Sequence, residues 1–219
     1  MFPIGDDNSE ITRFSLVTWV LIGLNVLVFV YELILGDSLQ AFIMDWGTVP
    51  REIADGQELH TLLSSMFIHG GFAHIFGNML FLKVFGDNVE DRLGHLRFLI
   101  FYLVTGLAAS VVYVMLNASS SIPSVGASGA ISGVLGAYII MFRHNRVSVF
   151  WGYGVFHVPA WMMIGFWALQ QFFATVATIA RTEQTDGGGI AYAAHAGGFV
   201  AGVILALIMG RRWKFNSRN

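Results

Sequence analysis

The sequence predicts an all-α membrane protein, a bundle of six transmembrane helices with both termini in the cytoplasm. Only 12% of the 219 residues are charged and 55% are hydrophobic. The mean hydropathy is +0.65, and uncharged apolar runs recur at lengths that suit a bilayer. Soluble domains carry about 25% charged residues, roughly twice this share. The lipid bilayer is therefore the expected environment, and the net charge of -2 argues against a nucleic-acid partner.

The expected spans follow from length, because a hydrocarbon core of roughly 30 Å needs about 20 apolar residues as helix. The six expected spans are 14–35, 62–85, 98–116, 126–142, a segment of 147–180 starting near 158, and 189–210. The first run has no cleavage site after it, so we expect a retained anchor rather than a signal peptide. One membrane domain, 14–210, then lies between a short cytoplasmic tail, 1–13, and a basic cytoplasmic tail, 211–219.

The positions of the basic residues predict the orientation. With the N-terminus inside, only Arg51 and Arg181 of the twelve Lys and Arg residues lie on the outer side. The others are Arg13, Lys83, Arg92, Arg97, Arg143, Arg146, Arg211, Arg212, Lys214 and Arg218. This asymmetry is what the positive-inside rule expects of short loops, and it favours six spans over five or seven.

Three polar side chains are expected at one depth in the membrane. Counted from the cytoplasmic ends of their spans at 1.5 Å per residue, Ser128 lies at roughly 22 Å, His195 at roughly 24 Å and His74 at roughly 20 Å. All three then lie below the outer face by about a quarter to a third of the core. Polar side chains are costly there, so they are candidates for function.

Ser128 and His195 together predict serine hydrolase chemistry. Ser128 begins a helix, where unpaired N–H groups and the helix dipole favour a developing oxyanion. His195 can take the serine proton and return it to the leaving amine. Each also has a plainer alternative, because Ser128 could be an N-cap and His195 a packing histidine.

Two faces of small residues give a reason to expect this pair to meet. The faces are Gly129, Gly133 and Gly136 in the fourth span, and Gly198 and Gly202 in the sixth. Small residues allow close approach of helices in membranes. Close packing of these faces would bring Ser128 towards His195.

The remaining chemistry is limited by what the chain lacks. The fourth and sixth spans carry no Asp or Glu, so a dyad rather than a triad is expected. His74 and Asn78 are i, i+4 neighbours that could donate to an oxyanion, although hydrogen bonding between helices is an alternative role. There is no cysteine and no His-Glu-x-x-His pattern, which argues against a zinc peptidase. We expect no metal and no cofactor.

Five short segments stand out in order along the spans. They are residues 69–78 (HGGFAHIFGN), 90–94 (EDRLG), 126–129 (GASG), 158–161 (VPAW) and 194–198 (AHAGG). Together they resemble the rhomboid family of intramembrane serine proteases over nearly the whole chain. The resemblance implies a rhomboid-like six-helix bundle with Ser128 as nucleophile and His195 as general base. It also implies that His74 and Asn78 bind the oxyanion, helped by backbone N–H groups near Ser128.

The resemblance extends to substrates and substrate entry. It implies that the fifth span, with Trp167 and Phe172 or Phe173, forms a lateral gate. The family cleaves single-span membrane proteins in or near the transmembrane helix and needs no cofactor. The implied partners are therefore single-span transmembrane proteins and the lipid bilayer, and the oligomeric state is left open. We expect a multi-pass protein of a prokaryotic cell membrane.

Two positions depart from the family's pattern. Members often carry Trp-Arg nine and eight residues before the position of His69, where this chain has His60 and Thr61. Many also carry an aromatic residue four positions after the nucleophile, packed on the catalytic histidine, and here that residue is Ser132. The sequence therefore leaves open what orients His195.

Two other functions compete with proteolysis. One is an inactive rhomboid-like protein that binds membrane helices, although such relatives tend to lose the dyad that this chain keeps. The other is a small transporter, which predicts inverted repeats and broken helices at the midplane. We find no such repeat, and the polar cluster lies off-centre.

Overall fold

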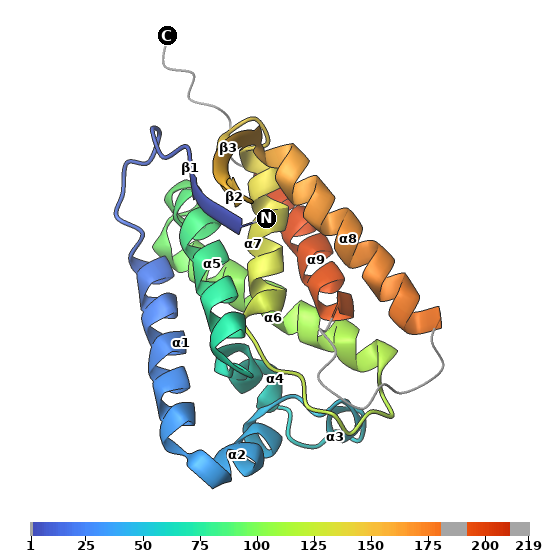
Figure 1. Cartoon of the computed structure of the whole chain (residues 1–219). Helices are drawn as coiled ribbons and strands as arrows, with labels where there is room; N and C mark the ends of the chain where they lie inside the picture. The colour runs from blue at the N-terminus through green and yellow to red at the C-terminus, as the bar shows by residue number, and fades with distance from the viewer. Residues whose placement is uncertain (1, 181–191, 211–219) are drawn as a thin grey trace.

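The computed structural model describes residues 2–180 and 192–210 and is mainly helical (Figure 1). Its long helices are α1 (Leu16–Ile34), α5 (Phe72–Leu93), α6 (His95–Leu116), α7 (Ser128–Met141), α8 (Ala160–Ala180) and α9 (Tyr192–Gly210). Short helices between α1 and α5 are η1 (Gly36–Ser38), α2 (Leu39–Trp46), α3 (Pro50–Ala54), α4 (Thr61–Ser64) and η2 (Ser65–Phe67). Three strands are β1 (Phe2–Asp6), β2 (Arg146–Trp151) and β3 (Gly154–Pro159).

The short helix α7 lies at the centre of the bundle. Figure 1 shows it between α1 and α5 on one side and α8 and α9 on the other. Every residue from 129 to 138 is buried. The sequence of α7 explains this, because small and apolar side chains surround the helix and leave no polar face for water.

Glycines bring the backbones of α7 and α9 into direct contact, as the sequence predicted. A Cβ added at Gly198 would overlap the carbonyl oxygen of Gly129, and one added at Gly202 would overlap that of Gly133. A Cβ at Gly136 would overlap the carbonyl oxygen of Phe199. The expected close packing of two glycine faces is therefore confirmed, and it fixes how α9 lies against α7.

The chain is a multi-pass membrane protein. Among the described residues, four helices are long and apolar enough to cross a bilayer: α1, α6, α8 and α9. The helix α7 is apolar but shorter, and α5 is not among the four because it carries more polar residues. The six-span topology therefore stays a prediction. The expected bounds of five spans agree with the helices to within a few residues. Arg181, residues 189–191 and the tail 211–219 lie outside the described residues.

The second expected span, 62–85, is wrong in its bounds. The structure has α4 and η2 from residue 61 to residue 67, then an extended residue at Ile68, and α5 begins only at Phe72. Gly70 and Gly71 break the helix here, an effect that hydropathy does not register. At its other end α5 runs on to Leu93 and stops at Gly94, whose φ of 79° suits glycine.

The all-α prediction also misses a small antiparallel sheet with strand order β1-β2-β3. Pro3 pairs with Val149, and Val149 pairs with Phe156. Along β2 the buried residues Val147 and Val149 alternate with more exposed ones, which is a strand pattern. A hydropathy window averages over such alternation, so it does not separate the hairpin from the rest of the uncharged stretch 147–180. The strand β1 lies in the expected N-terminal tail.

Acidic residues at the end of α5 hold the start of α1. The Glu90 carboxylate accepts hydrogen bonds from the N–H groups of Val17 and Thr18 at 2.8 and 2.7 Å, and from the Thr18 hydroxyl at 2.6 Å. Asp91 Oδ1 accepts from the N–H of Arg13 at 2.8 Å. Glu90 satisfies two N–H groups in the first turn of α1, where a negative charge is favoured, and Asp91 holds the segment just before that helix. They provide a structural role for the segment 90–94.

A buried carboxylate ties the sheet to the bundle. Asp6 of β1 accepts hydrogen bonds from the Tyr138 hydroxyl at 2.5 Å and from Asn88 Nδ2 at 2.7 Å. Burial raises the pKa of Asp6 to about 7, and the nearby Asp87 and Asp7 carboxylates add to the shift. Asp6 therefore favours its protonated form in the folded protein more than a free Asp does.

Candidate active site

The predicted site residues line one cavity of about 630 Å³. His74 and Asn78 come from α5, Ser128 from α7 and His195 from α9. The segment 122–125, which leads into α7, forms part of the wall, and so does Trp167 of α8. The structure thus brings all four sequence-predicted residues together from three helices.

Ser128 is the first residue of α7, and its hydroxyl is not used as a cap. The N-cap position belongs to Ala127, and no side-chain cap hydrogen bond is made there. The N-cap alternative is therefore wrong. Within the described residues no direct hydrogen bond joins Ser128 to His195, although both face the same cavity. Such nucleophile–base contacts are often long without substrate and tighten when it binds.

Gly126 positions the turn that presents Ser128. Its φ of 122° lies in a region that favours glycine, and its N–H donates to the Ser65 carbonyl oxygen at 2.8 Å. A Cβ added at Gly126 would lie 2.7 Å from Cε1 and Nε2 of His74 and 3.6 Å from Nδ2 of Asn78. The backbone just before the serine therefore runs directly beside the two predicted oxyanion donors.

His195 is held by α8, which the sequence did not predict. Its Nδ1 lies 2.7 Å from Oε1 of Gln171. Its ring centroid is 6.2 Å from that of Trp167, with the planes inclined by 34°, and 6.5 Å from that of Tyr192, nearly perpendicular. Gln171 was missed because a glutamine in an apolar run gives no local sign of which side of the helix it faces.

Hydrogen bonds to His74 and Asn78 of α5 leave each side chain with an N–H group free for the cavity. The N–H of Gly70 donates to Nδ1 of His74 at 3.4 Å, so the neutral ring carries its proton on Nε2, the atom that faces Gly126. Asn78 Nδ2 lies 3.0 Å from Nε2 of His69. An amide nitrogen has two hydrogens, which leaves one for the cavity.

His69 supports this arrangement from behind. Its Nδ1 lies 3.3 Å from the Phe67 carbonyl oxygen, and its N–H donates to the Glu32 carboxylate at 3.0 Å. The Glu32 side chain belongs to α1 and is only 2% exposed. His69 is thus fully engaged in hydrogen bonds. Within the described residues no cluster of three His, Cys, Asp or Glu side chains could hold a metal ion.

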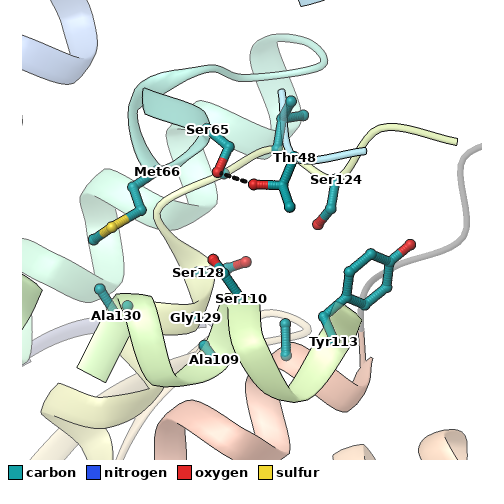
Figure 2. A pocket seen from close by; sticks show the side chains of 14 residues that line it. Thr48, Ser65, Met66, Ala109, Ser110, Tyr113, Ser124, Ser128, Gly129 and Ala130 are labelled. Carbon is teal, nitrogen blue, oxygen red and sulfur yellow. Dashed lines mark hydrogen bonds between the residues drawn. The ribbon is translucent and has the colours of Figure 1, made fainter. Parts of the chain in front are cut away.

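A second, much smaller cavity of about 20 Å³ lies behind Ser128. Figure 2 shows its wall, where the hydroxyl groups of Thr48 and Ser65 are hydrogen bonded 2.8 Å apart and Ser124 and Tyr113 lie alongside. A polar cavity of this size can hold one water molecule. Ser128 therefore lines both the main cavity and this small polar cavity.

Comparison with known proteins decides the family. The Rhomboid domain model matches residues 56–212 of this chain. The chain belongs to the rhomboid family. Members of this family are mostly serine proteases, and their substrates are generally membrane proteins.

Related rhomboids occur in plants, fungi and bacteria. RHOMBOID-like protein 5 of Arabidopsis thaliana is 27% identical over 178 residues, which cover 81% of this chain and 52% of that protein. Rhomboid protein 1, mitochondrial, of Saccharomyces cerevisiae is 32% identical over 191 residues, 85% of this chain and 51% of that protein. Rhomboid protease GluP of Bacillus subtilis is 34% identical over 130 residues, 59% and 25% respectively. The chain spans about half the length of the first two.

The two departures from the rhomboid pattern have structural counterparts. His60 packs edge-on against Trp46 with ring centroids 5.5 Å apart, and the Thr61 carbonyl oxygen accepts from the Thr48 hydroxyl at 2.8 Å. These contacts hold the first loop. Ser132 lines the main cavity, and its hydroxyl donates to the Ser128 carbonyl oxygen at 2.6 Å. It therefore packs within α7 rather than against the histidine.

The residues expected at the gate lie on two sides of α8. Trp167 lines the main cavity. Phe172 and Phe173 are 58% and 61% exposed on the outer surface of the bundle, with ring centroids 5.7 Å apart. Only Trp167 is therefore within reach of a group bound beside Ser128.

Proposed function

We propose that this chain is an intramembrane serine endopeptidase that cleaves single-span membrane proteins in or near their transmembrane segment. Ser128 is the nucleophile, His195 the general base, and His74 and Asn78 stabilise the oxyanion. The observation that carries the proposal is the shared cavity, which collects these four side chains from α5, α7 and α9. The family's protease members support the same function.

The geometry supports a complete reaction cycle. Ser128 Oγ attacks the carbonyl carbon of the scissile peptide while Nε2 of His195 takes its proton. The carbonyl oxygen becomes negative, and Nε2–H of His74, Nδ2–H of Asn78 and the N-terminal end of α7 stabilise that charge. When the C–N bond breaks, His195 gives its proton to the leaving amine. Water then attacks the acyl ester, passes a proton to His195, and Ser128 leaves with that proton restored.

The cavity supports a dyad rather than a triad. None of the described residues that line it is Asp or Glu. The Nδ1 atom of His195 instead contacts the uncharged amide of Gln171. We propose that the catalytic groups lie below the outer face of a bilayer crossed six times, with the N-terminus inside, in a prokaryotic cell membrane. A buried carboxylate at that depth would be costly, which is consistent with an uncharged partner.

Cleavage of a single-span reporter in proteoliposomes tests this function. Ser128→Ala and His195→Ala should each abolish cleavage while the protein still inserts and folds, since each removes one participant in proton transfer. Asn78→Ala should lower kcat by about 10²-fold or more, which is the usual effect of losing one oxyanion donor.

Matched controls keep the result specific. Ser132→Ala removes a hydroxyl that lines the same cavity but is hydrogen bonded to the α7 backbone. His157→Ala removes a histidine of β3 that contacts Ser148. Both should retain cleavage within a few-fold of wild type. Undiminished cleavage by folded Ser128→Ala would overturn the protease assignment and leave helix binding as the function.

A further inference from the structure

Among the described residues, the His195 ring is hydrogen bonded to a side chain that comes from α8. We infer that Gln171 is the positioning residue for His195, holding the ring through its amide oxygen in place of the aromatic residue that many rhomboids carry at the position of Ser132. The inference rests on the proposed function, because it assigns a role to the partner of the general base. It answers what the sequence left open.

The two atoms are placed for a strong hydrogen bond. Oε1 of Gln171 lies 2.7 Å from Nδ1 of His195. An amide oxygen can only accept, so Nδ1 must carry the hydrogen of the neutral ring. The lone pair then resides on Nε2, the nitrogen that must accept the Ser128 proton. The same contact fixes the tautomer and the rotation of the ring, which are the two properties a general base needs.

Gln171 belongs to a face of α8 that packs on the face of α9 carrying His195. Trp167 and Gln171 are i, i+4 neighbours, as are His195 and Phe199. The Trp167 ring lies 6.2 Å from the His195 ring and 6.0 Å from the Phe199 ring, so the two pairs meet across the helices. Gln171 is 8% exposed. A polar side chain buried in such surroundings is costly unless it is hydrogen bonded, and His195 provides the partner.

The adjacent glutamine supplies a natural comparison. Gln170 follows the exposed residue Leu169 and is itself exposed, on the outer side of α8. The two glutamines have the same side chain and belong to the same helix, but they lie on different sides of α8. Of the two glutamines, Gln171 is the one that is hydrogen bonded to His195.

The test compares Gln171→Met with Gln170→Met and Gln171→Glu in the reporter assay. Methionine keeps the length of the side chain and lacks the amide oxygen. Gln171→Met should lower kcat by about 10²-fold, as expected for a misplaced catalytic group, and leave KM within about two-fold. Gln170→Met should match wild type. Gln171→Glu keeps an acceptor oxygen in the same place, so, in protein that folds despite the cost of a carboxylate at this depth, it should recover most of the lost kcat. Equal kcat for Gln171→Met and Gln170→Met would overturn the inference.

A second measurement does not depend on activity. The ¹⁵N NMR signals of labelled histidine report which ring nitrogen carries the proton, and a His195→Asn spectrum identifies the His195 signals. The full-length wild type should show hydrogen on Nδ1, whereas Gln171→Met should show a substantial population with hydrogen on Nε2. An unchanged His195 signal in folded Gln171→Met overturns the inference. If wild type shows the expected tautomer but cleaves no reporter, the proposed function fails and the positioning role does not.

Discussion

The close backbone contact between α7 and α9 allows a sharp prediction for the addition of a single methyl group. Gly198 lies one helical turn after His195, and a Cβ there would overlap the carbonyl oxygen of Gly129, the residue that follows Ser128. Gly198→Ala should therefore push α9 away from α7 at the depth of the dyad. A backbone oxygen cannot rotate out of the way as a side chain can, so the helices themselves must move.

Helix propensity and steric overlap have opposite effects on the stability of Gly198→Ala. Alanine is favoured over glycine in a helix by about 1 kcal/mol. A relaxed carbon–oxygen contact needs roughly 3.3 Å, so the helices must separate by about 1 Å, and overpacking of this kind costs about 1–3 kcal/mol. The overlap outweighs the helix propensity. A displacement of about 1 Å at a catalytic group can lower the rate by about 10²-fold, so cleavage should fall more visibly than stability.

Gly165→Ala is the matched control, because a Cβ added at Gly165 on α8 meets nothing within 4 Å. The assay measures kcat/KM on the single-span reporter and the free energy of unfolding in the same detergent. Gly198→Ala should lose about 10²-fold in kcat/KM and up to about 2 kcal/mol in stability, whereas Gly165→Ala should lose neither. Equal activity and stability of the two variants would refute the argument that the glycine contact sets the dyad geometry.

Three further predictions concern Gly126, Asp6 and Glu90. Gly126→Ala should abolish most cleavage in a folded protein, because its φ of 122° disfavours alanine and the new Cβ would lie 2.7 Å from the His74 ring; reporter activity within two-fold of wild type would contradict this. The folded-state pKa of Asp6, raised to about 7 from 3.8, means that the folded protein binds an extra proton between these values. The unfolding free energy of the wild type should therefore fall as pH rises from about 4 to about 7. Asp6→Asn should flatten this part of the curve. An equal slope in both proteins would contradict the raised pKa of Asp6. Glu90→Gln should lower the unfolding free energy by about 1–2 kcal/mol, since the carboxylate holds the first N–H groups of α1, and kcat should change little; a variant as stable as wild type would contradict the capping role.

The sequence could predict which helices pack closely around Ser128 and His195 because its signals are local. A serine at the start of an apolar run, a histidine in another run, and glycines spaced along both segments specify which helices pack closely. The depths counted for Ser128, His195 and His74 agree with their common cavity. The reason is that a helix has a fixed rise per residue, so position along the chain converts directly to position along the helix.

The rest depends on information that hydropathy does not carry. After Arg146 the hairpin of β2 and β3 contains no charged residue, and a long window averages out the alternation of buried and exposed residues along β2. The start of α5 is set by Gly70 and Gly71 rather than by apolar content. Which of Gln170 and Gln171 faces His195 depends on how α8 is rotated against α9. That rotation is set by tertiary packing and cannot be read from the residues of α8 alone.

Mass spectrometry of the protein after treatment with a fluorophosphonate tests the central claim most directly. The reagent phosphonylates an activated serine hydroxyl with loss of fluoride, so it reports both the nucleophile and the base that activates it. We expect one adduct, on Ser128, and its loss in folded His195→Ala. An adduct on another serine, or labelling of Ser128 that is equally fast without His195, would contradict the assignment of this pair.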